Sequence, residues 1–310
     1  MGCILGEATR TSPEKGQKHL HLLAMNRRNL LQHLLNPIAR SNFLYGFLNR
    51  TLIKWIYFLV FLRKAKLRDD IIVHHPELAT EITLGTVLSG PFEGMKYGSV
   101  ISHCSLHYPK LLGTYESELH LCIEQVRDSA YEVVVDVGAA EGYYAVGFAR
   151  LMPATRVIAY EVDPSAREQL AKLASLNGLS RQVEIREGCH PGELLKLKEK
   201  RGLMIIDCEG YEEVLLAEEV IIKLAGWDFL IETHDGYSRG VTQRLIRRFS
   251  ATHDVRIQDT VHDLDKADRF PQERLACLRR EDQDLLMAEE REGANLRWLF
   301  CRAKMHSVDL

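Results

Sequence analysis

The stretch from Val133 to Tyr144 constrains the fold of this chain more than any other. It opens with a run of β-branched residues that contains Asp136, and Gly138 and Gly142 follow four positions apart. A helical pattern begins directly after Gly142. Glycines at such a strand-to-helix turn allow a ligand to approach the backbone closely. The stretch therefore predicts the binding loop of a nucleotide-type cofactor.

The charge of this loop favours one cofactor over another. A dinucleotide places its pyrophosphate on backbone amides, and the carboxylate of Asp136 would repel that anion. Ala140 also stands where a dinucleotide loop has its middle glycine. S-adenosylmethionine carries an ammonium and a sulfonium and no phosphate, so an acid beside the glycines suits it. We therefore expect S-adenosylmethionine and keep an NAD-dependent oxidoreductase as the alternative enzyme.

Three later apolar runs also end in acids. Glu161 closes the run that starts at Arg156. It lies 25 positions after Asp136, at the place where a carboxylate usually holds a ribose diol. Asp207 and Glu232 close two further runs. Ligands of open α/β sheets bind at the carboxyl edge of the strands. Four acids at that edge predict a single site.

Three of these segments together resemble a known family. Asp136–Tyr144, Glu161–Pro164 and Asp207–Glu212 are similar to the signature segments of the FkbM-type S-adenosylmethionine-dependent methyltransferases. The resemblance covers roughly residues 115 to 260, and the chain departs from the usual pattern at Glu141 and Cys208. It implies O-methylation of a hydroxyl on a sugar, a glycolipid or another secondary metabolite. The acceptor would be a small molecule or a glycan or lipid-linked compound.

The cofactor residues follow from the loop and the strand ends. We expect the loop to surround the methionine moiety, Glu161 to bind the ribose, and the segment after the third strand to lie near the adenine. In related enzymes the helix before the first strand borders the cofactor pocket, so Tyr115 and Glu116 are candidate contacts. The cofactor-binding set is Asp136, Gly138, Ala139, Glu141, Gly142, Glu161, Glu187 and Gly188.

The acceptor side has two candidate chemistries. His234 directly follows the fifth predicted strand and is the candidate general base, with Asp207 beside it as a second catalytic residue. Alternatively, His234 is a hydrogen-bonded histidine at a strand end. Asp207 and Glu232 are also candidate ligands for Mg²⁺, which would lower the pKa of a bound hydroxyl. Against a metal, acids in this region could instead cap helices or pair with basic residues.

Strand and helix patterns alternate from residue 131 to residue 249, which predicts a doubly wound, mostly parallel seven-stranded sheet of the class I methyltransferase, Rossmann-like type. The resemblance implies that residues 254–258 and 296–301 form a closing antiparallel pair. The expected domains are a basic, aromatic-rich helical extension over 1–80, a small strand-rich elaboration over 81–114, and the methyltransferase domain over 115–310. A charged insert at about 261–295 would either cover the substrate side or be a solvated helical excursion.

Cysteine usage and charge restrict the environment and the partners. The seven cysteines show no C-x-x-C pair, which is typical of reduced thiols and a cytoplasmic protein. Between Lys15 and Arg68 the sequence has 11 Lys or Arg and no acid, whereas the remainder is acidic. An acidic catalytic region disfavours nucleic acid as a partner.

Residues 19–66 have a helical pattern, and aromatic residues are frequent in the second half. The uninterrupted apolar run, Trp55 to Leu62, is far shorter than the roughly 20 residues of a spanning helix. Two interpretations remain open: a helical extension that packs on the catalytic domain or across a homodimer, or peripheral binding to anionic lipid. A non-catalytic, membrane-associated cofactor-binding scaffold is the alternative from outside the enzymes.

Overall fold

The computed structural model describes residues 41, 46, 52, 54–291 and 296–304. Most of the helical pattern predicted over 19–66, within the expected extension 1–80, therefore lies outside the described residues. By its internal contacts the chain divides into two units, residues 1–67 and 68–310. Helix α4, Lys54–His74, contains the boundary. None of the helices in the described ranges has the length and apolar character needed to cross a membrane.

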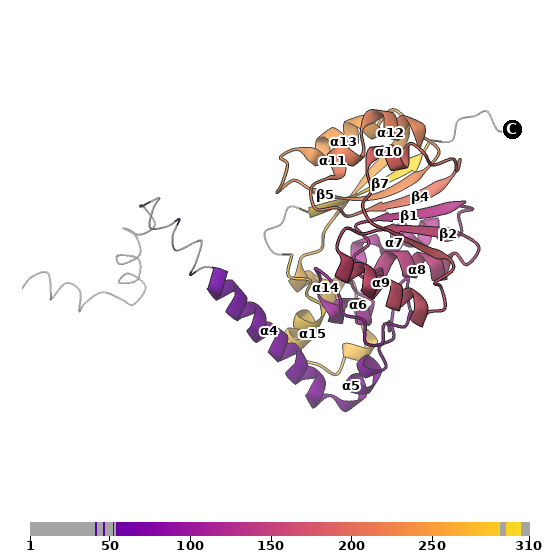
Figure 1. Ribbon diagram of the computed structural model, residues 1–310. Coiled ribbons are helices and arrows are strands. Elements are labelled where there is room, and N and C mark those ends of the chain that lie inside the picture. The colour runs from indigo at the N-terminus through magenta and orange to yellow at the C-terminus, as the bar shows by residue number, and fades with distance from the viewer. Residues whose placement is uncertain (1–40, 42–45, 47–51, 53, 292–295, 305–310) are drawn as a thin grey trace, which may run out of the picture. The chain divides into compact units, whose positions relative to one another are not determined.

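The second unit is built on one sheet of seven strands in the order β3-β2-β1-β4-β5-β7-β6 (Figure 1). All neighbours pair in parallel except β7, which is antiparallel to β5 and to β6. The class I methyltransferase architecture expected from the sequence is therefore confirmed, including its closing antiparallel pair. The strands are β1 Val133–Val137, β2 Arg156–Tyr160, β3 Val183–Arg186, β4 Gly202–Ile206, β5 Asp228–His234, β6 His253–Asp259 and β7 Leu296–Ala303.

Apolar residues on successive strand positions face opposite sides of this sheet, because side chains alternate along a strand. Val134 packs in a core under one face, whereas Val133 and Val135 pack in a core under the other. Figure 1 shows the two layers of helices that cover these faces. The first layer is α7 His120–Val126, α8 Tyr143–Leu151 and α9 Pro164–Leu176; the second is α10 Pro191–Leu194, α11 Glu212–Leu215, α12 Glu218–Lys223 and α13 Val241–Phe249.

Local chemistry sets where these helices begin. Asp163 caps α9, because its carboxylate accepts hydrogen bonds from the amides of Ser165 and Ala166. Pro164 occupies the first helical position, where its fixed φ suits the helix. Gly142 adopts a φ of 96° immediately before α8, so a residue with a side chain would be strained there. The turn from β1 to α8 thus depends on glycine.

Three details differ from the sequence-based expectation. The prediction of a strand-rich elaboration over 81–114 was wrong: residues 81–83 end helix α5, Pro76–Thr83, and the others form turns, one isolated bridge between Thr86 and Lys96, and the short helix α6, His107–Leu112. Its glycines at 85, 90, 94 and 98 all have positive φ and produce turns instead of separating strands. Helix α10 ends at Leu194 instead of residue 199, and the helix predicted over 212–223 is divided into α11 and α12.

The charged region at 261–295 is helical in its described part. It contains α14 Asp263–Arg269, the 3-10 turn η3 Glu273–Leu275 and α15 Arg280–Met287. With α5, Pro76–Thr83, and α6 it encloses a third apolar core, to which Leu78, Leu112 and Leu286 contribute. Residues 288–291 follow α15 and lead to the carboxyl edge of the sheet, where Arg291 pairs with Glu232.

Candidate functional site

The loop after β1 lies unusually close to the end of β4. Gly138 has a φ of 84°, and a β-carbon at this position would lie only 1.7 Å from the carbonyl oxygen of Asp207. The amides of Gly138 and Ala139 both donate to the carbonyl of Tyr160, at 2.9 and 3.0 Å. Glycine is therefore required at position 138 by both conformation and space. The loop is fixed between the ends of β2 and β4, and this arrangement brings the predicted acids together.

Asp136 is buried in this region, with 2% of its surface exposed. Its Oδ2 atom has no hydrogen-bond partner among the described residues. Burial, followed by the nearby Asp207, raises the pKa of Asp136 to about 8. A buried carboxyl oxygen without a donor is costly, and a cation bound beside it would offset that cost. Asp136 is therefore suited to a positively charged ligand.

Glu161 at the end of β2 is held in one orientation by the backbone. Its two carboxylate oxygens accept hydrogen bonds from the amides of Ala140 and Asp163, each at 2.8 Å. Each oxygen keeps further acceptor capacity, because a carboxylate offers about four lone-pair positions. The carboxylate is thus anchored to the loop after β1 and available to a diol.

The predicted adenine segment follows β3. The side chain of Glu187 is 86% exposed and lies 3.5 Å from the guanidinium of Arg167. Gly188 lies near Val162, since a β-carbon on it would be 3.9 Å from that side chain. The structure therefore places this segment beside the residues that follow β2. The roles of Glu187 and Gly188 stay predictions.

Glu141 differs from the other predicted cofactor residues, because protein donors already occupy its carboxylate. The carboxylate is fully buried, forms an ion pair with Lys110, and accepts from the Tyr97 hydroxyl at 2.6 Å and the His103 amide at 3.0 Å. Burial opposes ionisation, but the Lys110 ammonium outweighs it and the pKa of Glu141 is lowered. Only the backbone of Glu141 remains for a cofactor, and its assignment to cofactor binding stays a prediction.

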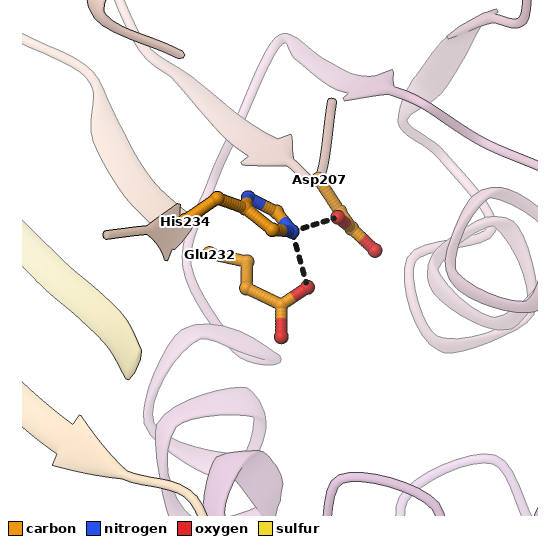
Figure 2. Close-up of side chains that lie close together, drawn as sticks. All are labelled: Asp207, Glu232 and His234. Atoms are coloured by element: carbon orange, nitrogen blue, oxygen red, sulfur yellow. Dashed lines mark ion pairs between the residues drawn. The ribbon is translucent and has the colours of Figure 1, made fainter. Parts of the chain in front are cut away.

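His234, Asp207 and Glu232 converge at the ends of β4 and β5 (Figure 2). The Nε2 atom of His234 lies 3.6 Å from Asp207 Oδ1 and 3.7 Å from Glu232 Oε2. Glu209 Oε2 lies 3.5 Å from the same nitrogen. One ligand atom from each of His234, Asp207 and Glu232 can be chosen so that all three lie within 4.8 Å of one another. The sequence prediction that these residues share a site agrees with this geometry.

A buried acid orients the histidine ring. Nδ1 of His234 lies 2.6 Å from Oε1 of Glu212, whose carboxylate is fully buried. Burial alone would lower the pKa of His234, but the hydrogen bond to Glu212 and the charge of Asp207 outweigh it and raise this pKa. With the Nδ1 proton held by Glu212, Nε2 presents its lone pair to the cluster. The ring can therefore accept a proton or bind a metal ion at Nε2.

Arg291 closes the site from the segment after α15. Its guanidinium forms ion pairs with Glu116, with Glu232 at 2.5 Å and with Glu289 at 3.0 Å, and it donates to the Tyr115 hydroxyl at 3.0 Å. The sequence indicated Tyr115 and Glu116 as candidate cofactor contacts, but it did not indicate that Arg291 or Glu289 belongs to the site. The charged character of 261–295 was the only available signal, and it did not single out a residue.

Acids outnumber bases around this edge. Burial and the neighbouring Glu116 raise the pKa of Asp207 to about 6, and burial and Asp207 raise the pKa of Glu232. Burial raises the pKa of each of these carboxyls most, and the neighbouring acid raises it further, so positive charge at the site would favour their ionised forms. A cationic ligand, a metal ion or both would supply such positive charge.

Several solved structures are similar to this chain. An rRNA methylase from Streptococcus thermophilus is 13% identical with a TM-score of 0.42, covering 61% of this chain and 97% of its own. The C-terminal domain of precorrin-6Y C5,15-methyltransferase from Rhodobacter capsulatus is 17% identical (TM-score 0.40; 60% and 87% covered). Precorrin-6y C5,15-methyltransferase from Geobacter metallireducens GS-15 is 14% identical (TM-score 0.40; 60% and 86%).

Neither a family model nor a curated protein sequence matches this chain. The resemblance to the FkbM-type enzymes therefore stays a prediction. The fold assignment depends on the strand order and on the antiparallel β7, and the function depends on the site.

Proposed function

We propose that the protein is an S-adenosylmethionine-dependent methyltransferase that acts on a hydroxyl oxygen. The observation that carries this proposal is the buried, donor-free Oδ2 of Asp136 beside the glycine loop. An ammonium would donate to this oxygen and favour the ionised carboxylate, whereas a pyrophosphate brings only negative charge and would disfavour ionisation. The same observation disfavours the NAD-dependent oxidoreductase.

The strand ends provide one group for each part of the cofactor. In the proposal, Asp136 binds the methionine ammonium, the backbone from Gly138 to Gly142 encloses the methionine moiety, and Glu161 binds the ribose diol. Glu187 and Gly188 lie toward the adenine. When bound, S-adenosylmethionine supplies a methyl group on its sulfonium; the acceptor oxygen would displace the sulfur from this methyl group, and S-adenosylhomocysteine, with a neutral sulfur, would leave.

His234 is the proposed general base. Its Nε2 would accept the proton of the acceptor hydroxyl while Glu212 holds Nδ1, so the ring would carry the charge that the oxygen gives up. Asp207, 3.6 Å from Nε2, would stabilise the imidazolium that forms. The raised pKa of His234 suits a base, because it increases the affinity of the ring for that proton.

A divalent ion at Asp207 and Glu232 is the competing mechanism for the same step. Both carboxylates and Nε2 of His234 lie close enough to share an ion. Mg²⁺ or a similar ion would act as a Lewis acid and lower the pKa of the acceptor hydroxyl. The two mechanisms exclude each other at one atom, because Nε2 cannot bind a metal and accept the proton.

The electrostatics of the site also restrict the acceptor. The carboxylates of Glu116, Glu232 and Glu289 pair with the guanidinium of Arg291, and Asp207 lies near it. Glu289 also pairs with Lys266, so the acids still outnumber the cations. A phosphorylated acceptor would be repelled, whereas a neutral hydroxyl compound would not. We therefore propose a neutral sugar, glycolipid or secondary metabolite, in agreement with the class implied by the FkbM resemblance.

Calorimetric titration with S-adenosylhomocysteine tests the cofactor. We expect micromolar binding that Asp136→Ala abolishes and that Asp254→Asn, on the exposed side of β6, leaves unchanged. Binding of NADH in place of S-adenosylhomocysteine would overturn the proposal. Cofactor binding without methyl transfer to any acceptor in a panel of hydroxylated glycans and lipids would favour the scaffold.

Two experiments distinguish the two mechanisms. The first is calorimetric titration of the protein with MgCl₂ and with MnCl₂, and the second is a methyl-transfer assay with and without a chelator. A metal at the site predicts heat from metal binding that disappears in Asp207→Asn and Glu232→Gln. Methyl transfer that survives the chelator and is lost in His234→Asn would assign the base mechanism. Loss of transfer with the chelator, restored by metal, would assign the metal.

A further inference from the structure

Helix α4 carries an unbroken series of exposed apolar side chains. All eight residues from Trp55 to Leu62 are exposed, and the fractions reach 63% at Trp55 and 72% at Tyr57. Helix α8 of the second unit shows the opposite pattern, since every residue from Tyr143 to Ala149 is buried. Large apolar side chains exposed in a contiguous series mark an interaction surface.

The arrangement around the helix axis indicates what covers this surface. Successive residues of an α-helix are about 100° apart, so eight consecutive apolar residues cover the whole circumference. A groove on a protein partner, or a second copy of the same helix, would cover one face and leave the opposite face in water. A hydrocarbon phase covers all faces at once.

The length of the run indicates how deeply it can enter a membrane, and the charges beside it indicate which lipids it prefers. Eight helical residues rise about 12 Å, which is less than half of the roughly 30 Å hydrocarbon core of a bilayer. Basic residues lie at both ends of the run: Lys54 precedes it, and Arg63 and Lys64 follow it. The acid-free sequence from Lys15 to Arg68 extends this basic character. Anionic headgroups complement such a segment.

We propose that residues 55–62 of α4 insert into one leaflet of an anionic membrane and anchor the protein peripherally. The apolar side chains enter the acyl region, and the flanking basic side chains remain at the headgroups. This inference depends on α4 alone and is independent of the chemistry at the sheet edge. It places the enzyme at the interface where a lipid-linked acceptor would be found.

Trp55 provides a direct measurement in the full-length protein. The chain has three tryptophans, and the other two, Trp227 and Trp298, are buried at 1% and 0% exposure. A blue shift of the emission on addition of vesicles therefore reports Trp55. We expect the shift, and co-sedimentation, with phosphatidylcholine vesicles that contain phosphatidylserine, and weaker binding as salt is raised.

Matched variants test whether the apolar run is responsible. Phe58→Glu and Phe61→Glu should each weaken vesicle binding by about tenfold or more, since each removes a buried aromatic side chain from the acyl region. Ile222→Glu, at a position on α12 that is 63% exposed, should leave binding unchanged. Circular dichroism and S-adenosylhomocysteine binding would show that the variants remain folded.

Four other outcomes would overturn the proposal. These are no binding to anionic vesicles, equal binding to neutral and anionic vesicles, equal loss in Ile222→Glu, and concentration-dependent self-association without lipid that Phe58→Glu abolishes. The last outcome would assign the surface to a second copy of the chain. Failure of any of these lipid measurements would leave S-adenosylhomocysteine binding unaffected, so the two proposals are tested separately.

Discussion

Asp136 and Glu141 are both buried acids in or beside the same loop, but their surroundings are opposite. Glu141 is paired with Lys110 and accepts two further hydrogen bonds, and its pKa is lowered. Asp136 has an oxygen without a donor among the described residues, and its pKa is raised to about 8. Burial alone therefore does not identify a ligand-binding acid. The number of donors that the fold itself provides separates a structural acid from one available to a ligand.

The comparison predicts that Lys110→Met has the largest effect on stability. This substitution leaves the Glu141 carboxylate buried without its cation, which typically costs about 3–5 kcal/mol. We expect the free energy of unfolding, measured by urea denaturation, to fall by this amount. The ring contacts of Lys110 with Tyr115 and Tyr143, at 4.8 and 5.6 Å from the ring centroids, would be lost as well.

A double variant separates the ion pair from simple loss of packing. Lys110→Met combined with Glu141→Gln should cost less than the sum of the two single substitutions, because no unpaired charge remains. Additive losses would show that the pair contributes nothing as a pair, and the contrast with Asp136 would then disappear.

Asp136→Asn should have the next largest effect, on ligand affinity. Loss of a charge-assisted contact to the cofactor ammonium typically costs about 1.5–3 kcal/mol, which corresponds to roughly 10- to 100-fold weaker S-adenosylhomocysteine binding. Calorimetry on the folded variant measures this loss. Glu141→Gln should weaken S-adenosylhomocysteine binding less than Asp136→Asn does when both variants are folded. An equal or larger loss of affinity in Glu141→Gln would show that Asp136 is not the acid that binds the ammonium.

The pH dependence of stability should reveal the same acid in the ligand-free protein. Because the pKa of Asp136 is raised from 3.8 to about 8, the folded state retains a proton that the unfolded chain releases. Its contribution to the free energy of unfolding is therefore complete below about pH 4 and is lost as the pH rises toward 8, by at most about 1.4 kcal/mol per unit. Subtracting the pH profile of Asp136→Asn from that of the wild type measures this slope. A flat difference would contradict the raised pKa.

Arg156→Ala should have the smallest effect. Arg156 pairs with Glu184 and Glu199 on the surface, where its side chain is 46% exposed. Exposed ion pairs contribute about 0–1 kcal/mol, so urea denaturation should detect little change. A loss comparable to that of Lys110→Met would show that burial is not what makes the Glu141 pair important.

The sequence predicted the parts of this molecule that depend on local pattern. The strands and the acids at their carboxyl ends follow from short apolar runs, and a parallel sheet necessarily brings those ends to one edge. The structure brings Asp207, Glu232 and His234 close together at that edge, and the roles predicted for these residues and for Asp136 and Glu161 stay predictions.

Features that depend on contacts distant in sequence could not be predicted. Tyr97 and Lys110, which donate hydrogen bonds to Glu141, lie 44 and 31 positions earlier along the chain. Arg291 reaches Glu116 across 175 positions. No periodicity connects such residues, and the glycine-rich segment at 81–114 resembled strands separated by turns although it consists mainly of turns.

The position of β7 between β5 and β6 has a consequence for synthesis of the chain. β6 is translated before β7, but among the described strands it pairs only with β7. It therefore cannot join the sheet until residues 296–303 have left the ribosome, although β1 to β5 can pair as they emerge. During that interval the nascent chain exposes β6 and the edge of β5 that later pairs with β7. A chaperone or another strand can bind at either place.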